Sequence, residues 1–487
     1  MRDSLRSLQS KADAVVDSRA VVDRALAEGG TYYGVNTGFG ALAREKIDAE
    51  RLETLQRNLL LSHAVGVGEW VPREISALML KVKVHSLGLG FSGVSIPVFE
   101  RLLDFCENDL TPAIPSRGSV GASGDLAPLA HMSLPLIGRG LFWSRETDGF
   151  EDASEVLARM GWEPVRLSPK DGLSLINGTQ LMSAYGAYVL ERCIRLIRLV
   201  DVAAAMTLEA LQGSLVPFDE RIHHARPYRG QLEVAANVRQ MLVDSEILES
   251  HRDCGKVQDP YSLRCVPQVH GATRGALRHA RDVLEVELNA ATDNPLVFPG
   301  AILSGGNFHG QPLALAMDYA AIALSELASI SERRIYLLLA GDDGLPQLLM
   351  RETGINSGFM IPQYTAAALV SENKVLAHPA SVDSLPTSLG QEDHVSMGSI
   401  SAVKLLSIFR NVETVIAIEL LAAAQALDYR LPLRPGRGVE AAHRFIRKVI
   451  PHREEDYYFR EDLDPFMEIM RGDALLNSVE MEVGELL

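Results

Sequence analysis

One short block of the chain combines residue types that could build a reactive group. Residues 118–131 read GSVGASGDLAPLAH, with three glycines around a small Ala-Ser pair. If the Gly124 amide nitrogen attacked the Ala122 carbonyl, a five-membered ring would close, since glycine has no side chain to obstruct it. Loss of water from that ring and from the Ser123 hydroxyl would leave an electrophilic methylidene. The simpler interpretation is a tight turn before a helix, and physical grounds alone favour it.

The residue after this block, Asp125, is placed to begin a helix. Aspartate is a preferred N-cap, because its carboxylate accepts hydrogen bonds from the free N–H groups of a first helical turn. The positive end of such a helix would also stabilise negative charge near the ring. We therefore predict a helix that opens at Asp125.

Six further blocks place polar or aromatic side chains in or near turns, where they could contact a substrate. They are centred on Tyr33, His63, Asn177, Arg264, Phe308 and Glu392. Each block also has a structural interpretation. A glycine-rich segment is often only a turn, a single histidine on a helix is often a structural residue, and a charged run is usually a solvated surface.

Taken together, the seven blocks resemble the histidine, phenylalanine and tyrosine ammonia-lyase family, over nearly the whole chain. Residues 118–131 are similar to the family's signature, in which Ala-Ser-Gly becomes 4-methylideneimidazole-5-one (MIO). The resemblance implies that Ala122, Ser123 and Gly124 form this cofactor by autocatalytic cyclisation, with no external cofactor.

The resemblance also implies roles for residues in three of the glycine-containing blocks. Tyr33, in YYGVNTGFG, matches a tyrosine that serves as base or acid; a phenol with a pKa near 10 needs help from its neighbours to do so at neutral pH. Asn177, in NGTQ, matches a residue that holds the amino-acid head group near the ring. Phe308, in SGGNFHG, matches a phenylalanine that packs near the ring.

The block QDPYSLRC is expected to bind the substrate carboxylate. Arg264 matches the family's carboxylate-binding arginine, and a guanidinium forms a two-pronged, charge-assisted pair with a carboxylate. Tyr261, expected to be catalytic, and Gln258 match residues close to the ring and the substrate.

Two residues favour the histidine-specific branch of the family: His63, in NLLLSHAVG, and Glu392, in LGQEDHVSM. One imidazole can hydrogen-bond another. A carboxylate can accept a bond from an imidazole N–H or take part in proton transfer. The resemblance thus implies deamination of L-histidine to trans-urocanate and ammonia, the first step of histidine degradation.

Other functions stay open. Within the family, a tyrosine or phenylalanine ammonia-lyase or an MIO aminomutase is the alternative. From other classes, a non-catalytic helical protein could keep the fold. Fumarase-like lyases are also helical, but their Gly-Ser-Ser loop with Met-Pro and Lys is not present. Near the key blocks, Val266, His270 and the pair Leu389-Gly390 depart from the usual histidine-type pattern.

Long helices must position these loops. The spacing of apolar residues and the scarcity of glycine and proline predict helices over residues 181–212, 273–294, 313–340 and 399–428. Apolar residues occur on more than one face of the last two, which is typical of helices in a bundle or a subunit interface. Strand signals are short and weak, and residues 146–165 look the least regular.

The predicted fold is therefore mainly α, a long-helix bundle with a smaller, loop-rich N-terminal region. The resemblance implies an architecture of the ammonia-lyase and fumarase type. We expect residues 1–165 to hold the Tyr33 loop and the MIO segment, and residues 166–487 to form the central and C-terminal bundle. The resemblance also implies a homotetramer whose active sites are shared between chains.

Charge and composition indicate which classes of binding partner this protein has. The formal charge of 47 − 63 = −16 argues against nucleic acid, which requires a basic face. Four unclustered cysteines (Cys106, Cys193, Cys254 and Cys265) and the lack of a metal-binding motif suggest a reduced, cytoplasmic protein without a metal. No signal peptide or apolar run of about 18 residues is found, so no membrane span is expected. The expected partner is a small amino-acid substrate.

Overall fold

The computed structural model describes residues 12–40, 47–252, 255 and 257–487 of the chain. Cys254 and most of the charged N-terminal segment, residues 1–11, lie outside the described residues. The chain forms two compact units, each made of three separate stretches. Unit 1 contains Met1–Tyr188, Ala280–Asp318 and Pro379–Val403, and unit 2 contains Val189–His279, Tyr319–His378 and Lys404–Leu487.

Four long helices dominate the chain, as predicted: α9 (Gln180–Ala210), α14 (Val266–Leu288), α15 (Gln311–Leu339) and α17 (Gly398–Asp428). Three of them lie within three residues of the predicted bounds. α15 has no glycine or proline after Pro312. A proline is tolerated in the first turn of a helix, because the N–H groups there have no helical partner. Gly186 inside α9 allows close packing, since a Cβ there would lie 2.7 Å from Met317 Cε.

The predicted helix over residues 273–294 is placed wrongly at both ends. α14 begins at Val266 and ends at Leu288. Residues 290–294 leave the helix because their polar groups have tertiary partners. The Thr292 hydroxyl accepts a hydrogen bond from Gln180 Nε2 at 2.9 Å, and the buried Asp293 pairs with Lys170 at 2.8 Å.

Three short helices of unit 1 pack on one another: α3 (Leu52–His63), α6 (Leu126–Ser133) and α8 (Asp171–Ile176). α8 is buried along its whole length. Their ends carry three of the chemical blocks, because His63 ends α3, Ser123 shortly precedes α6 and Asn177 follows α8. The packing of these helices therefore gathers segments that are far apart in sequence.

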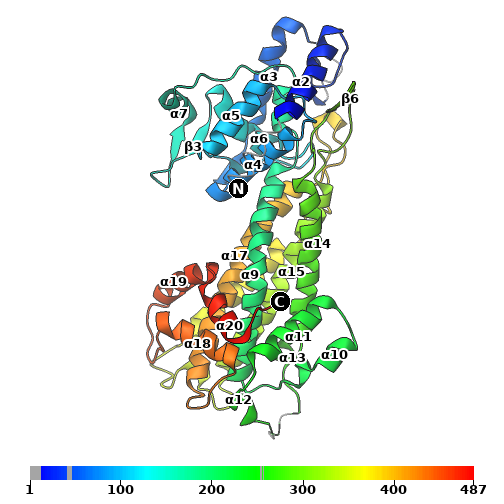
Figure 1. Cartoon of the computed structure of the whole chain (residues 1–487). Helices are drawn as coiled ribbons and strands as arrows, with labels where there is room; N and C mark the ends of the chain where they lie inside the picture. The colour runs from blue at the N-terminus through cyan, green and yellow to red at the C-terminus, as the bar shows by residue number, and fades with distance from the viewer. Residues whose placement is uncertain (1–11, 41–46, 253–254, 256) are drawn as a thin grey trace. The chain divides into compact units, whose positions relative to one another are not determined.

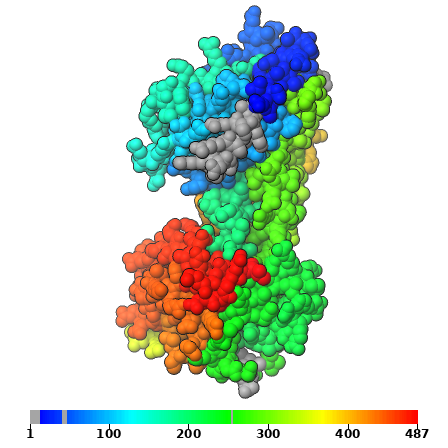
Figure 2. Space-filling view, in the orientation of Figure 1, coloured from blue at the N-terminus to red at the C-terminus, as the bar shows by residue number. Residues whose placement is uncertain are grey.

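The other helices of unit 1 come from the first third of the chain, which is drawn in blue and cyan (Figures 1 and 2). They are α2 (Ala12–Ala27), α4 (Arg73–Gly88), α5 (Ile96–Glu107) and α7 (Ala153–Met160), with the 3-10 turns η2 (Ala49–Arg51), η3 (Leu134–Ile137) and η6 (Ser388–Gly390).

Sheet is sparse in the described residues, in line with the weak strand signals. Three antiparallel pairs are present, all in unit 1: β1 (Val67–Trp70) with β2 (Pro115–Arg117), β3 (Leu141–Trp143) with β4 (Phe150–Asp152), and β5 (Leu296–Phe298) with β6 (Ala301–Leu303). The mainly α fold class is thereby confirmed.

Residues 146–165 are more regular than the sequence suggested. Strand β4 pairs with β3, and α7 follows at once. The Asp152 carboxylate caps α7 by accepting a hydrogen bond from Ser154 N at 2.8 Å, and Gly161 ends the helix in the left-handed conformation. Val156 and Leu157 are buried on its inner face. An eight-residue amphipathic helix was too short to detect by periodicity.

Unit 2 consists of helices and loops, with no strand in its described part. Its remaining helices are α10 (Glu220–His224), α11 (Arg229–Met241), α12 (Glu246–Glu249), α13 (Tyr261–Arg264), α16 (Met360–Leu376), α18 (Arg437–Val449), α19 (Arg460–Arg471) and α20 (Ala474–Val483), with η4 (Val216–Phe218) and η5 (Gln347–Leu349). α20, in red, packs on α18 (Figures 1 and 2). The predicted boundary between residues 1–165 and 166–487 was based on the position of the motifs and not on packing. This division stays a prediction.

Within the described residues, one helix, α15, is long and apolar enough to cross a membrane by length and composition alone. However, 61% of its most apolar window is buried inside the protein, as in the core helix of a globular bundle. Cys106, Cys193 and Cys265 are free thiols. Among the described residues, no cluster of three His, Cys, Asp or Glu side chains could hold a metal ion.

Candidate active site

The Ser123 segment runs between β2 and α6 through glycines in the left-handed region. Gly124 has φ of +76°, and a Cβ there would lie only 2.0 Å from the Gly178 carbonyl oxygen. Gly121 has φ of +68°, and a Cβ there would meet Ser396 Oγ at 2.2 Å. Only glycine fits both the dihedral angles and the space at these two positions. These glycines are therefore required by the fold as well as by any ring chemistry.

The turn after α8 holds the Ser123 segment on one side. Asp125 N donates to the Gly178 carbonyl at 2.7 Å, and Gly178 N donates to the Ser123 carbonyl at 3.4 Å. The Asn177 side chain adds a second donor, Nδ2, at 3.3 Å from the same Ser123 oxygen. Asn177 is 3% exposed, and its Oδ1 has no hydrogen-bond partner among the described residues.

A second segment, just before α17, holds the same loop. Met397 N donates to the Val120 carbonyl at 2.9 Å, and Ser396 Oγ donates to the Gly121 carbonyl at 3.1 Å. Ala122 is buried against Val395 and Met397. The segment that carries Ser123 is thus fixed by two stretches that are remote in sequence.

Asp125 precedes α6, as predicted, but it does not cap that helix. Its carboxylate accepts hydrogen bonds from Leu181 N at 2.9 Å and Met182 N at 3.1 Å, which belong to the first turn of α9. Ser399 Oγ donates to its other oxygen at 2.8 Å. Burial raises the pKa of Asp125 to about 7, although these hydrogen bonds lower it. Asp125 therefore ties the Ser123 segment to another helix.

Glu392 reaches Ser123 from the QEDH block. Ser123 Oγ donates to Glu392 Oε1 at 3.2 Å, across 269 positions of sequence. The other carboxylate oxygen, Oε2, accepts a hydrogen bond from Thr387 Oγ1 at 2.7 Å. Thr387 orients Glu392 in this way, and sequence reasoning missed it because no motif marks a threonine five residues away.

Tyr33 contributes a phenol to the same cleft. Its hydroxyl oxygen accepts a hydrogen bond from Gly40 N at 3.1 Å, and Phe39 packs edge-on to its ring. Burial raises the pKa of Tyr33 above its ordinary value; the Gly40 bond lowers it, and the negative charge of Glu392 raises it. The neutral phenol is therefore the dominant form at neutral pH.

His63 stands at the end of α3, where its Nδ1 lies 3.0 Å from Ser62 Oγ. Burial lowers the pKa of His63 below its ordinary value, although a hydrogen bond from its ring to the main-chain carbonyl of Leu59 and the charge of Glu392 raise it. The imidazole is thus mainly neutral at pH 7, with one nitrogen able to donate and the other to accept.

Seven predicted site residues line two adjoining hollows of unit 1. A cleft of about 420 Å³ is lined by Tyr33, His63, Ser123, Asn177 and Glu392. A second hollow of about 410 Å³ shares four of these residues and adds Ala122, Phe308 and His309. Unit 1 thus brings together seven of them: Tyr33, His63, Ala122, Ser123, Asn177, Phe308 and Glu392.

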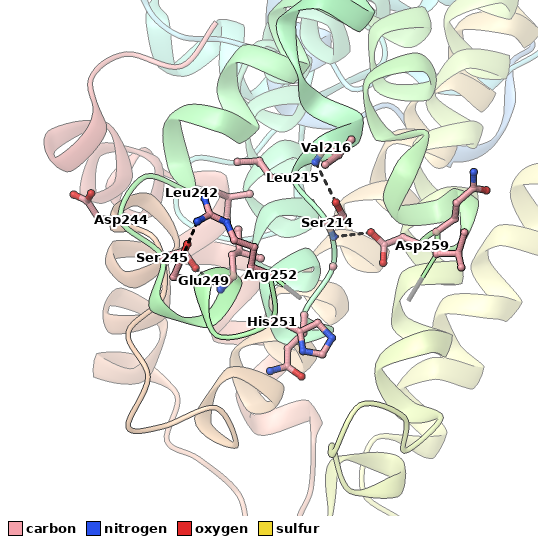
Figure 3. Close-up of a pocket in the computed structure, with 15 residues that line it drawn as sticks. Ser214, Leu215, Val216, Leu242, Asp244, Ser245, Glu249, His251, Arg252 and Asp259 are labelled. Atoms are coloured by element: carbon pink, nitrogen blue, oxygen red, sulfur yellow. Dashed lines mark hydrogen bonds and ion pairs between the residues drawn. The ribbon is translucent and has the colours of Figure 1, made fainter. Parts of the chain in front are cut away.

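Gln258, Tyr261 and Arg264 belong to unit 2. The segment is anchored by Asp259, whose carboxylate accepts a hydrogen bond from Ser214 N at 2.6 Å (Figure 3). The Arg264 guanidinium lies 4.8 Å from the Tyr261 ring centroid, and Tyr261 is 72% exposed. Their roles toward a substrate stay predictions.

Lys83 was also missed by sequence reasoning. It lies in α4, is 1% exposed, and donates from Nζ to the Asn177 carbonyl at 2.7 Å. The available signal was a charged residue within the apolar run MLKVKVH, which by itself is easily taken as a surface position.

Comparison with known proteins identifies the family. A family model described as aromatic amino acid lyase matches residues 3–448. The chain belongs to the aromatic amino acid lyase family. Members of this kind break a carbon–nitrogen bond, so the chain is a carbon–nitrogen lyase. The family resemblance drawn from the motif blocks is thereby confirmed.

Within this family, the chain is similar to histidine ammonia-lyase of Myxococcus xanthus, with 50% identity over 96% of this chain and 92% of the relative. Among solved structures it is similar to histidine ammonia-lyase from Trypanosoma cruzi, with a TM-score of 0.89, 43% identity and coverage of 98% and 90%. It is also similar to tyrosine aminomutase from Streptomyces globisporus, with a TM-score of 0.91, 35% identity and coverage of 98% and 95%.

Proposed function

We propose that this lyase removes ammonia from L-histidine, giving trans-urocanate, as the first step of histidine degradation. The observation that carries the proposal is the cleft in which His63 and Glu392 line the same space as Ser123. A neutral imidazole and a carboxylate are the groups expected to recognise the imidazole of a histidine substrate. The identity of about half of all residues with histidine ammonia-lyases supports the same substrate.

We further propose that the cofactor is MIO, formed by autocatalytic cyclisation of Ala122, Ser123 and Gly124. The residues present fit this group. Gly124 lies where any side chain would collide with Gly178, and the buried Asn177 Oδ1 has no partner among the described residues. A polar atom of this kind is costly unless a further group satisfies it. When formed, the ring would supply an electrophilic carbon that activates the substrate for loss of ammonia.

The side chains of unit 1 would bind and orient the substrate around this group. Tyr33 is the proposed base for the β-proton, and its raised pKa means that a neighbouring group must favour the phenolate when the substrate binds. His63 and Glu392 would hold the imidazole, Asn177 the head group, and Phe308 would pack against the ring. Positioning of this kind supplies much of an enzyme's rate.

Arg264, Gln258 and Tyr261 would complete the site from another copy of the chain. We propose a homotetramer whose active sites are shared between chains. Exposed apolar residues on α15 support an assembly: Leu315, Tyr319 and Ile322 follow the three- and four-residue spacing of one helix face, and each is more than 40% exposed. The remaining proposals are a cytoplasmic location, an amino-acid substrate, and no nucleic-acid, membrane or metal partner.

The alternative is a tyrosine or phenylalanine ammonia-lyase or an MIO aminomutase, which the likeness to a tyrosine aminomutase keeps open. The deciding experiment offers L-histidine, L-tyrosine and L-phenylalanine to the purified chain and identifies the products. We expect urocanate and ammonia from histidine at the highest kcat/KM. A preference for tyrosine, or a β-amino acid product, would refute the substrate assignment.

The cofactor is tested separately by the intact mass. We expect the chain to be lighter than its sequence mass by two water molecules. An unshifted mass together with no lyase activity would favour the non-catalytic alternative. An unshifted mass with full activity would exclude MIO while leaving the reaction in place.

A further inference from the structure

Lys83 is an ionisable side chain buried beneath the proposed active site. It lies in the middle of α4 and is 1% exposed. Its Nζ donates to the main-chain carbonyl of Asn177 at 2.7 Å. Burying an ammonium group without an opposite charge is costly, so this position needs an explanation beyond packing.

Lys83 has no carboxylate within ion-pair distance in the part of the chain that the structure describes. The nearby Asp293 instead pairs with Lys170, at 2.8 Å. Burial lowers the pKa of Lys83 to about 7; the charges of Asp293 and Asp125 raise this pKa, and that of Lys170 lowers it. The hydrogen bond to the Asn177 carbonyl therefore engages the terminal amino group of Lys83 directly.

Asn177 is the residue through which this bond can act on the chemistry. Its side-chain amide holds the Ser123 carbonyl oxygen at 3.3 Å. The next residue, Gly178, pairs with both Ser123 and Asp125 and lies against Gly124. Lys83 thus fixes the main chain of a turn that contacts all three of these positions.

We propose that Lys83 is a positioning residue, which holds the Asn177–Gly178 turn in the geometry that the Ser123–Gly124 segment needs for ring formation and for turnover. The inference rests on the proposed function and deepens it. Lys83 makes and breaks no covalent bond in this role, and it contacts no substrate. Its loss should therefore affect ring formation and kcat much more than KM.

The test uses the full-length chain with three substitutions. Lys83→Met keeps the length of the side chain but removes the donor and the charge. Lys83→Gln keeps a shorter N–H donor without the charge. Lys81→Met is the matched control, because Lys81 lies on the same helix but is only half-buried and contributes to no pocket described above. The measurements are intact mass, circular dichroism, and kcat and KM for L-histidine.

We expect Lys83→Met to fold and to show a reduced fraction of chains that have lost two waters. Its kcat per cyclised chain should fall by about 10- to 100-fold, the effect expected of a small displacement in an active site. KM should stay within about threefold, because no substrate contact is removed. Lys83→Gln should recover part of the loss, and Lys81→Met should match the unmutated chain.

Three results would overturn the inference. The first is full ring formation and full kcat in Lys83→Met. The second is an equal loss in Lys81→Met. The third is failure of both Lys83 variants to fold, which would assign Lys83 to the stability of α4 instead. Failure of the proposed function is distinguishable, because it would appear in the unmutated chain as an unshifted mass or as no urocanate.

Discussion

Two walls of the cleft in unit 1 are built in different ways. The ring wall, residues 118–125, is held by hydrogen bonds from two remote segments, and its tight turns are made by glycine. The exposed wall, residues 388–390, also turns through positive φ, but Ser388 and Leu389 adopt φ of +50° and +55° without being glycine. Leu389 is 95% exposed. The proposed ring chemistry requires a fixed ring wall, whereas the exposed wall places non-glycine residues in strained conformations.

The largest effect on ring formation and activity is expected from a substitution of Ser123 in the ring wall. Ser123→Ala removes the hydroxyl that ring formation must lose, so the mass should stay at the sequence value. Activity should fall by at least about a thousandfold, since an enzyme's rate depends on its reactive group. Circular dichroism should be unchanged, because the hydroxyl makes one side-chain hydrogen bond, to Glu392. Full activity in this variant would exclude the cofactor.

Gly124→Ala tests the packing of the ring wall. The new Cβ would lie 2.0 Å from the Gly178 oxygen, in a left-handed conformation that costs a non-glycine residue about 1–2 kcal/mol. We expect the free energy of unfolding to fall by at least about 2 kcal/mol, with loss of ring formation. The measurement is chemical denaturation followed by circular dichroism.

Gly275→Ala is the control for that substitution. A Cβ at Gly275, within α14, would have nothing within 4 Å. Alanine is the better helix former, so this variant should gain about 0.5–1 kcal/mol. Equal losses of stability in the two variants would show that the Gly178 contact has no special importance.

His63 tests substrate choice rather than ring formation. His63→Leu removes a hydrogen-bonding partner of the substrate imidazole, so kcat/KM for L-histidine should fall by about tenfold or more. The mass loss of two waters should be complete, because His63 has no hydrogen bond to the ring wall among its described contacts. Unchanged kcat/KM would remove His63 from the substrate site.

The lowered pKa of His63 predicts that kcat/KM for L-histidine falls on the acid side of its pH profile. Burial lowers the pKa of His63, so the imidazole is neutral at pH 7 and gains a proton only below its ordinary value of 6.5. Protonation removes its acceptor nitrogen, so kcat/KM should fall as the pH drops below about 6.5. The free substrate also titrates there, and the profile of His63→Leu is the control. Identical profiles would contradict the assignment.

The smallest effect on stability, ring formation and KM is expected from a substitution in the exposed wall. Leu389→Asn introduces a residue that tolerates the left-handed conformation, so stability should rise by at most about 1 kcal/mol. Ring formation should be complete, and KM should change by less than about threefold, since Leu389 lies at the rim. A loss of ring formation in this variant would show that the two walls are not independent.

Sequence patterns predicted much of the fold. The spacing of apolar residues and the scarcity of glycine and proline located α9, α15 and α17 to within three residues, because helix periodicity is a local property. The predicted end of α14 was wrong because residues 290–294 form tertiary contacts outside the helix, through Thr292 and Asp293. Helix α7 was missed because it is short.

The sequence by itself determined which residue types are available: an Ala-Ser-Gly triplet, a histidine and glutamate typical of one branch, and helices long enough to carry them. Only the tertiary structure decided which of them share a cleft. Ser123 meets Glu392 across 269 positions, Lys83 supports Asn177 across 94, and Asp125 caps α9 instead of its own helix. Local patterns cannot encode such contacts, because they depend on how helices pack.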